Sequence, residues 1–228
     1  MVLIQPLRFN LSCPLVTALF TVKYIHLQIE DSTPVVDSYF KVLIVSIIVV
    51  FTFFRICQEV DIVFGNKDTV EYDDISKLQF VRQTLKESLR KHPSASGTLR
   101  RTTKPEKFGS FLIPKGANIN FPIYVAHHLP ENWYDPECFN PDRFLGKNNS
   151  ENKISNFVYF PFSCGPRTCI GKDFSSISAS IVIAQLFRKF KFELVAGQTL
   201  QREEKLTMRP KGGVLCTIKK RSTRACQR

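Results

Sequence analysis

The stretch FPFSCGPRTCIGKDF, Phe160 to Phe174, constrains the fold and function of this chain more than any other. Its Gly and Pro residues predict a loop, and the apolar segment that follows predicts a long helix. Cys169 lies where the loop meets the helix. Unpaired amide groups in a first helical turn carry partial positive charge and favour a cysteine there as a thiolate, and Arg167 adds a full positive charge nearby.

A thiolate surrounded by Phe160, Phe162 and Ile170 indicates a soft metal centre with a single protein ligand. Zinc is disfavoured, because it requires three or four protein ligands and the sequence offers one good candidate. The alternative is a structural cysteine ahead of a core helix, since free cysteines are among the most buried residues. The sequence pattern around Cys169 favours the metal ligand.

Composition indicates a globular protein and limits its partners. The 228 residues are enough for one domain with a substantial core. Seven cysteines, an odd number at irregular spacings, give no disulfide framework and favour a reducing compartment. The net charge of +12 attracts polyanions or anionic membranes, but the basic residues are scattered, so no nucleic acid partner is expected.

A helix is predicted to begin at Asp73 or Asp74, which are suitable N-caps, and to end at His92-Pro93. Apolar residues recur at intervals of three and four and form one face: Leu78, Val81, Leu85 and Leu89. Glu87 and Arg90 are three residues apart and therefore neighbours on this helix. In isolation such a pair is an ordinary surface ion pair.

Short strands and an irregular segment are expected after this helix. Residues 94–103 and 117–125 are predicted as two strands, and residues 111–113 lead through a tight turn at 114–116 into the second strand. Residues 131–144, rich in Pro and aromatic residues, are predicted to be an irregular meander. A buried helix at 174–190 and closing strands at 191–195 and 214–219 complete the expected elements.

The two ends of the chain have a different character. Residues 1–54 contain two uncharged runs, 9–22 and 42–54, each shorter than the ~18–20 apolar residues of a membrane-spanning helix. The second run is interpreted as a buried strand, an interfacial segment, or the translation of a pyrimidine-rich stretch before a splice acceptor. Residues 222–228 are expected to form a basic tail.

The residues Phe162, Gly165, Arg167, Cys169 and Gly171 fill the pattern F-x-x-G-x-R-x-C-x-G, which resembles the haem-binding loop of cytochromes P-450. The order of features from about residue 55 to 221 resembles the same family. The resemblance implies a mainly α fold with small β-sheets (α+β), the C-terminal portion of the cytochrome P-450 fold, truncated. Residues 1–54 would then be a segment outside the family.

The resemblance also implies roles for individual residues around haem b (iron protoporphyrin IX). Cys169 would be the axial ligand of the iron, and Arg100 and Arg167 would hold the haem propionates. Phe162 would shield the thiolate, and Gly171 is the last fixed position of the loop.

A second set of residues would support the site. The family completes its E-x-x-R pair with an arginine in a P-x-R-F stretch, here residues 141–144. Glu87, Arg90 and Arg143 would therefore form a buried structural network that pins the meander. No side chain is assigned a catalytic role.

The implied function is a haem-thiolate monooxygenase, or its C-terminal part, that hydroxylates a sterol or other lipid. It would use dioxygen and electrons from an NADPH-dependent reductase. The expected location is the cytosolic face of the endoplasmic reticulum membrane, although the sequence shows no convincing anchor. No obligate oligomer is expected. Within the family, the segments 85–90, 96–100 and 159–163 look most like cholesterol 24-hydroxylases.

Two alternatives stay open: a catalytically inactive fragment with weak or no haem binding, and a haem-thiolate isomerase. The family's oxygen-activating step has one faint match, Glu30 to Thr33, which lacks the usual glycine and is followed by Pro34.

Overall fold

A computed structural model describes residues 50–65, 67, 71–145, 154–195, 197–198, 201–205 and 207–221. The faint match at Glu30 to Thr33, the first uncharged run, most of the second run, and the basic tail at 222–228 lie outside the described residues. The helix α3 (Val50–Phe64) begins at Val50 and therefore continues across the boundary expected between residues 54 and 55.

Helices and short strands alternate along the described chain. After α3 come α4 (Tyr72–Lys77), α5 (Gln79–Lys91), β1 (Thr98–Arg101), β2 (Glu106–Phe108), β3 (Phe111–Ile113), β4 (Asn118–Phe121), α6 (Ile123–Ala126), the 3-10 turns η1 (Pro141–Phe144) and η3 (Gly165–Arg167), α7 (Lys172–Lys189), β5 (Phe190–Leu194), β6 (Arg202–Glu204), β7 (Met208–Pro210) and β8 (Cys216–Lys220). Each strand pairs with one antiparallel partner, so the fold is mainly helical with small β-sheets.

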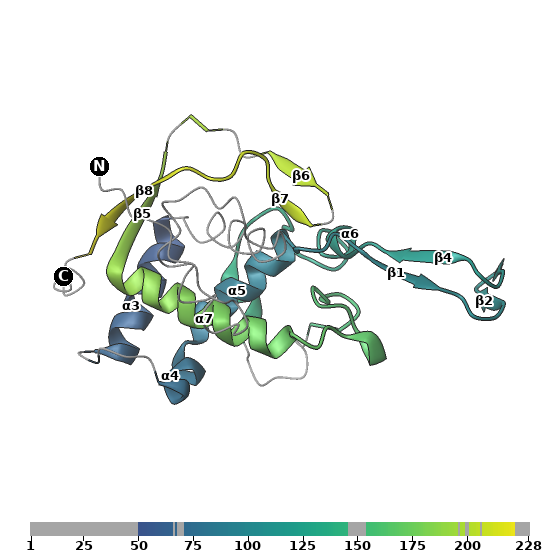
Figure 1. Cartoon of the computed structure of the whole chain (residues 1–228), viewed down its shortest axis with the longest axis horizontal. Helices are drawn as coiled ribbons and strands as arrows, with labels where there is room; N and C mark the ends of the chain where they lie inside the picture. Colours follow the sequence, from purple (N-terminus) through teal and green to yellow (C-terminus); the bar gives the residue numbers. More distant parts are fainter. Residues whose placement is uncertain are drawn as a thin grey trace, which may run out of the picture.

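The core lies where α3, α5 and α7 meet, with β5 along one side (Figure 1). Helix α7 crosses both other helices, and its Phe187 ring lies 5.2 Å from Phe53 of α3 and 5.4 Å from Phe192 of β5. The apolar face of α5 predicted from its spacing is buried at Val81, Leu85 and Leu89. This burial of apolar surface is the main stabilising contribution to the fold.

The predicted long helix from Asp73 is two helices, which corrects its expected start. Helix α4 has Glu71 as its N-cap, and the chain leaves helical geometry at Leu78 before α5 begins. The carboxylate of Glu59, on α3, accepts hydrogen bonds from Phe80 N at 2.7 Å and Val81 N at 2.9 Å. These bonds satisfy unpaired amides at the start of α5, so the break at Leu78 is stabilised from another helix.

Strands β1 to β4 form an arm that extends away from the helices (Figure 1). β1 pairs with β4, and β2 pairs with β3 at its far end through a turn at Gly109, whose φ is +61°. The two predicted strands are present, in shorter form, as β1 and β4, and residues 111–113 lead through a turn into β4 as predicted. The strand β2, which pairs with β3, was not predicted. The returning strand also ends early, at Phe121, because Pro122 has no amide to donate and α6 begins directly after it.

The predicted closing strands are confirmed within two residues. β5 pairs with β8, in the register Phe192 with Ile218. β6 pairs with β7, and Met208 N donates to Ser94 O at 2.8 Å, which ties this hairpin to the end of α5. Across the residues that can be described, no helix combines the length and the hydrophobicity needed to cross a bilayer.

Candidate functional site

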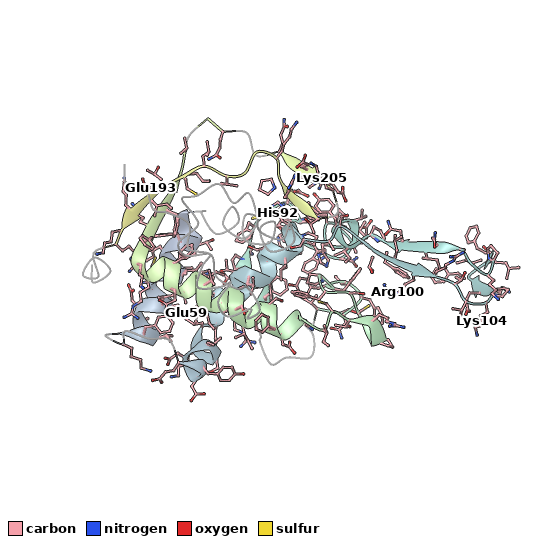
Figure 2. The ribbon with its side chains drawn as sticks, in the orientation of Figure 1. Glu59, His92, Arg100, Lys104, Glu193 and Lys205 are labelled. Atoms are coloured by element: carbon pink, nitrogen blue, oxygen red, sulfur yellow. The ribbon has the colours of Figure 1, made fainter. Side chains whose placement is uncertain are left out.

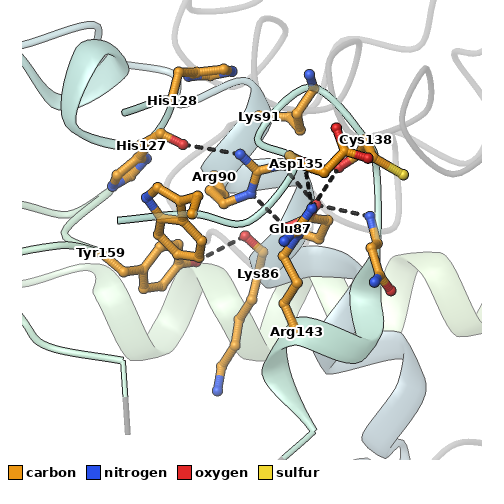
Figure 3. Close-up of polar contacts among 12 residues, drawn as sticks. Lys86, Glu87, Arg90, Lys91, His127, His128, Asp135, Cys138, Arg143 and Tyr159 are labelled. Carbon is orange, nitrogen blue, oxygen red and sulfur yellow. Dashed lines mark hydrogen bonds and ion pairs between the residues drawn. The ribbon is translucent and has the colours of Figure 1, made fainter. Parts of the chain in front are cut away.

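The side chains of Glu87 and Arg90 form a fully buried bidentate ion pair on α5 (Figure 3). Arg90 Nε lies 2.8 Å from Glu87 Oε2, and Arg90 Nη2 lies 2.8 Å from Glu87 Oε1. The guanidinium also donates from Nη1 to His127 O at 2.9 Å and from Nη2 to Cys138 O at 3.2 Å. A buried pair of this kind persists only because its remaining donors have partners.

Arg143, from η1, completes the network expected from the sequence. Its Nε lies 3.4 Å from Glu87 Oε1, in ion-pair range but without hydrogen-bond geometry. Its Nη groups donate to the carbonyl oxygens of Tyr134, Asp135 and Cys138. Arg90 and Arg143 together therefore bind backbone carbonyls along the meander, and Glu87 accepts from Asn140 N at 2.9 Å. The structure brings the three predicted residues together and joins them to the meander.

The loop that carries Cys169 has a backbone that few residues adopt. Ser163 has φ +62° and Gly165 has φ +76°, so both lie in the left-handed region. Gly165 reaches this conformation without steric cost, whereas Ser163 stores strain of about 1 kcal/mol or more. Cys169 N donates to Phe162 O at 2.9 Å and closes the loop. Strained residues of this kind cluster at ligand-binding sites.

Cys169 is exposed and lies two residues before Gly171, the N-cap of α7. The expectation that it occupies the first helical turn is therefore wrong, because the helix begins later, at Lys172, whose amide lies 3.3 Å from Cys169 O. The expected apolar surround is also incomplete. Phe162 packs against the core, but Ile170 is fully exposed. The thiol thus lies on an exposed part of the loop, between Arg167 and Lys172 in the sequence.

The two arginines expected to bind propionates differ in their surroundings. Arg100, half-buried on β1, donates from Nη2 to Ser163 Oγ at 3.0 Å, and from Nη1 to Thr98 Oγ1 and Leu99 O. Figure 2 places it where the arm joins the body, with Lys104 further toward the tip. Arg167 is exposed at the end of η3. Arg100 is therefore bonded to the loop that carries Cys169, and Arg167 belongs to that loop.

These residues fit a haem on the open side of Cys169. A Cβ added to Gly171 would meet only Cys169 Sγ, at 3.8 Å, so this glycine keeps space free beside the sulfur. One exposed thiol with two guanidinium groups suits a single-thiolate metal centre with anionic substituents. Among the residues described, no three His, Cys, Asp or Glu side chains gather into a group that could hold a metal ion.

His127, Ser163 and Glu59 are the polar residues of this region that sequence reasoning missed. His127 is fully buried; its carbonyl accepts from Arg90, and its ring nitrogen Nε2 accepts from Phe160 N at 3.0 Å (Figure 3 shows the first of these bonds). Burial lowers the pKa of His127 to about 4. In the sequence, His127 and His128 offered only a poor metal chelate, and no local signal distinguishes a histidine that binds backbone.

Comparison with known proteins places this arrangement in a family. The family model described as Cytochrome P450 matches residues 53–217. Cytochrome P450 3A18 of Rattus norvegicus is 35% identical over 139 residues, which cover 61% of this chain and 28% of that protein. Cytochrome P450 CYP72A616 of Paris polyphylla is 36% identical over 160 residues, covering 70% of this chain and 31% of that protein.

A solved structure agrees. The crystal structure of the cytochrome P450DA heme domain matches with a TM-score of 0.73 and 23% identity, over 82% of this chain and 41% of that chain. This likeness shows the fold, and the chain spans about three tenths of the length of the curated relatives named above. Because the family model covers most of the chain, with the buried network and the cysteine loop inside the match, the chain belongs to the cytochrome P450 family.

Proposed function

We propose that the thiolate of Cys169 would hold the iron of haem b and that the protein acts as a haem-thiolate monooxygenase. The observation that carries this proposal is the exposed thiol on a strained loop that is joined by hydrogen bonds to the buried Glu87–Arg90–Arg143 network. Loop strain and a buried ion network both cost stability, and both are expected where a ligand must be held in a fixed position.

Four further residues would hold the group. Arg167 and Arg100 would donate charge-assisted hydrogen bonds to the two propionates. Phe162 would shield the sulfur on its core side, and Gly171 would leave room for the macrocycle. When bound, haem with an axial thiolate supplies the ability to activate dioxygen and attack unactivated C–H bonds. The residues of this chain orient the sulfur and keep the loop fixed around it.

The proposed substrate is a sterol or other lipid, and the proposed electron donor is an NADPH-dependent reductase. Resemblance to cholesterol 24-hydroxylases in residues 85–90, 96–100 and 159–163 supports the substrate class. Lys172, exposed at the start of α7 and three residues from Cys169, supports docking of an acidic donor protein. Two further basic residues, Arg188 and Lys191, interact within the chain, with the Phe64 ring and with Glu193 respectively.

Membrane association is proposed as well, at the endoplasmic reticulum. Three apolar side chains are exposed at the tip of the arm: Phe108, Phe111 and Leu112. Lys104, Lys107 and Lys115 lie near them along the chain. Apolar tips with basic neighbours favour an anionic lipid surface.

Residues 55–221 are proposed as the family portion, with 1–54 as a separate segment and 222–228 as a basic tail.

A spectroscopic experiment tests the ligand. The purified chain is mixed with haem, reduced and exposed to carbon monoxide, and the red-shifted Soret band of a thiolate-ligated haem is expected. Cys169→Ala should abolish this band, whereas Cys164→Ala, a control five residues away in the same loop, should retain it. Persistence of the band in Cys169→Ala would show that Cys169 is not the ligand of the iron. Absence of the band in the unmodified chain would favour the alternative of a catalytically inactive fragment.

A further inference from the structure

His127 lies between the buried ion network and the cysteine loop and is bonded to both. Its position is fixed at the end of α6, where its amide donates to Ile123 O at 3.0 Å. Its carbonyl accepts from Arg90 Nη1 at 2.9 Å, which binds it to the network. The residue has no exposed surface. Its backbone is therefore held by α5 and α6, independently of the loop.

The imidazole ring reaches the loop. His127 Nε2 lies 3.0 Å from Phe160 N. Because a backbone amide can only donate, Nε2 must be the unprotonated nitrogen, and the proton of the neutral ring is on Nδ1. The ring stacks on Tyr159, with centroids 5.3 Å apart, and meets Phe160 edge-on at 5.6 Å. Aromatic contacts on the loop side thus fix the ring plane that makes this bond.

A continuous series of bonds leads from this ring into the strained part of the loop. Phe160 donates to His127, and Phe160 O accepts from Ser163 N at 2.9 Å. Ser163 is the left-handed residue, and its Oγ accepts from Arg100. The next bond, Cys169 N to Phe162 O, closes the loop at the cysteine. The ring of His127 therefore holds the first residue of a segment that ends at Cys169.

The other ring nitrogen lies on the side of α5. Nδ1 of His127 is buried and makes no hydrogen bond of normal geometry among the described residues. The backbone of Arg90 and of Leu89 nevertheless interacts favourably with the protonated ring, which is consistent with a proton on Nδ1. The ring bond that reaches the cysteine loop is therefore the one that Nε2 accepts from Phe160.

We propose that His127 is a positioning residue, a neutral imidazole protonated on Nδ1, that couples the Glu87–Arg90–Arg143 network to the loop carrying Cys169. Its relevance to haem rests on the proposed function, but the coupling itself is a property of the polypeptide. The charged and titratable groups around the ring are Arg90 on α5, His128 beside it in the chain, and Tyr159 on the loop side. Burial is the main cause that lowers the pKa of the ring, and the charges of His128 and Arg90 lower it further, whereas the backbone of Arg90 and of Leu89 acts in the opposite direction.

The first measurement is made on the chain without added haem. Nitrogen chemical shifts of the His127 ring report the tautomer, and Nδ1–H is expected; an Nε2–H tautomer would overturn the proposal. Native-state hydrogen exchange then reports the Phe160 amide. In His127→Phe, which keeps an aromatic ring but removes the acceptor, this amide is expected to exchange at least about tenfold faster, the loss of one hydrogen bond.

Matched variants separate positioning from general destabilisation. His127→Gln retains an acceptor near the Nε2 position and should restore protection of the Phe160 amide, and His127→Asn, with a shorter side chain, should not. His128→Phe is the control, because His128 Nδ1 bonds to Tyr124 O at 2.8 Å and makes no bond to the loop. If His127→Phe does not fold, the Gln and Asn variants make the same comparison. Unchanged exchange at Phe160, or an equal change in the His128 control, would refute the coupling.

The haem-loaded chain gives an independent result. His127→Phe should lower the fraction of thiolate-ligated haem in the carbon monoxide spectrum and accelerate haem loss, while His127→Gln should resemble the unmodified chain. If the unmodified chain shows no thiolate band but the exchange results are as expected, the proposed function fails and the coupling stands. If the band forms but His127→Phe leaves its intensity and the haem-loss rate unchanged, the coupling does not reach Cys169 and the proposal is wrong.

Discussion

Replacing the buried Arg90 by Met should destabilise the chain far more than replacing an exposed arginine of α5 by Met. Arg90 is fully buried and makes two bonds to Glu87 and one each to His127 O and Cys138 O. Removing one partner of a buried ion pair costs about 3–5 kcal/mol, because the remaining charge has lost its compensation. The guanidinium of Arg143 lies near the same Glu87 carboxylate but makes no hydrogen bond to it from Nε. Arg143 therefore offsets the uncompensated charge of Glu87 only in part.

Urea denaturation followed by circular dichroism measures this loss. With a typical m-value of about 2 kcal/mol per molar urea, a cost of 3–5 kcal/mol lowers the midpoint by roughly 2 M. Arg82→Met is the control, since Arg82 is exposed on the same helix, and it should change stability by less than about 0.5 kcal/mol. Arg90→Lys keeps the charge without the planar fork and should fall between the two. A loss below about 1 kcal/mol in Arg90→Met would refute the claim that the pair is buried and essential.

Three further outcomes are expected. Burial lowers the pKa of His127 and of His92 to about 4, so the folded state binds fewer protons than the unfolded state between about pH 6.5 and 4. The free energy of unfolding should therefore be fully retained above pH 6.5 and fall by up to about 3 kcal/mol per histidine as the pH drops to 4. Urea titrations across that range measure this loss, and a flat profile would contradict it. Ser163→Ala removes the acceptor of Arg100 but keeps the left-handed strain, and should cost about 1 kcal/mol, whereas a neutral result would mean that this bond contributes nothing. Phe187→Ala leaves a cavity between α3 and β5 and should cost about 3–5 kcal/mol by thermal unfolding, with a loss under 1 kcal/mol contradicting its place in the core.

Features that depend on local sequence were predictable. The apolar spacing of α5 reflects a helical period, and that face is buried. Helix α7 is present as predicted, but its burial begins at Ala179, and Phe174, near its start, is exposed. The E-x-x-R pair is set by the helix itself, since residues three apart are neighbours. The contact of Arg143 with Glu87 was expected only from the family resemblance, because no local rule brings η1 to α5.

Features that depend on distant partners were not predictable. The break at Leu78 contradicts the helical period and is stabilised by Glu59, which lies 21 residues from Phe80 in the sequence. The pairing of β3 with β2 was missed because three-residue strands carry too little pattern to fix a register. His127 was missed for the same kind of reason, since its two functional bonds join it to residues 37 and 33 positions away.

The arrangement around Cys169 separates the residues that would bind haem from those that fix their positions. Glu87, Arg90 and Arg143 lie at the far end of a series of backbone bonds from the thiol, so their effect must pass through the meander and through His127. Replacing a buried ion network by apolar residues is often neutral for stability, so the network is best explained by the carbonyls it orients. A rigid frame of this kind allows a strained loop and an exposed thiol to keep one geometry, because the strain is balanced by contacts on α5 and α6. Binding of haem to that single geometry would then stabilise the folded chain by mass action. Variants that weaken the contacts of α5 and α6 with the loop should therefore lower the affinity for haem and the stability of the folded chain together.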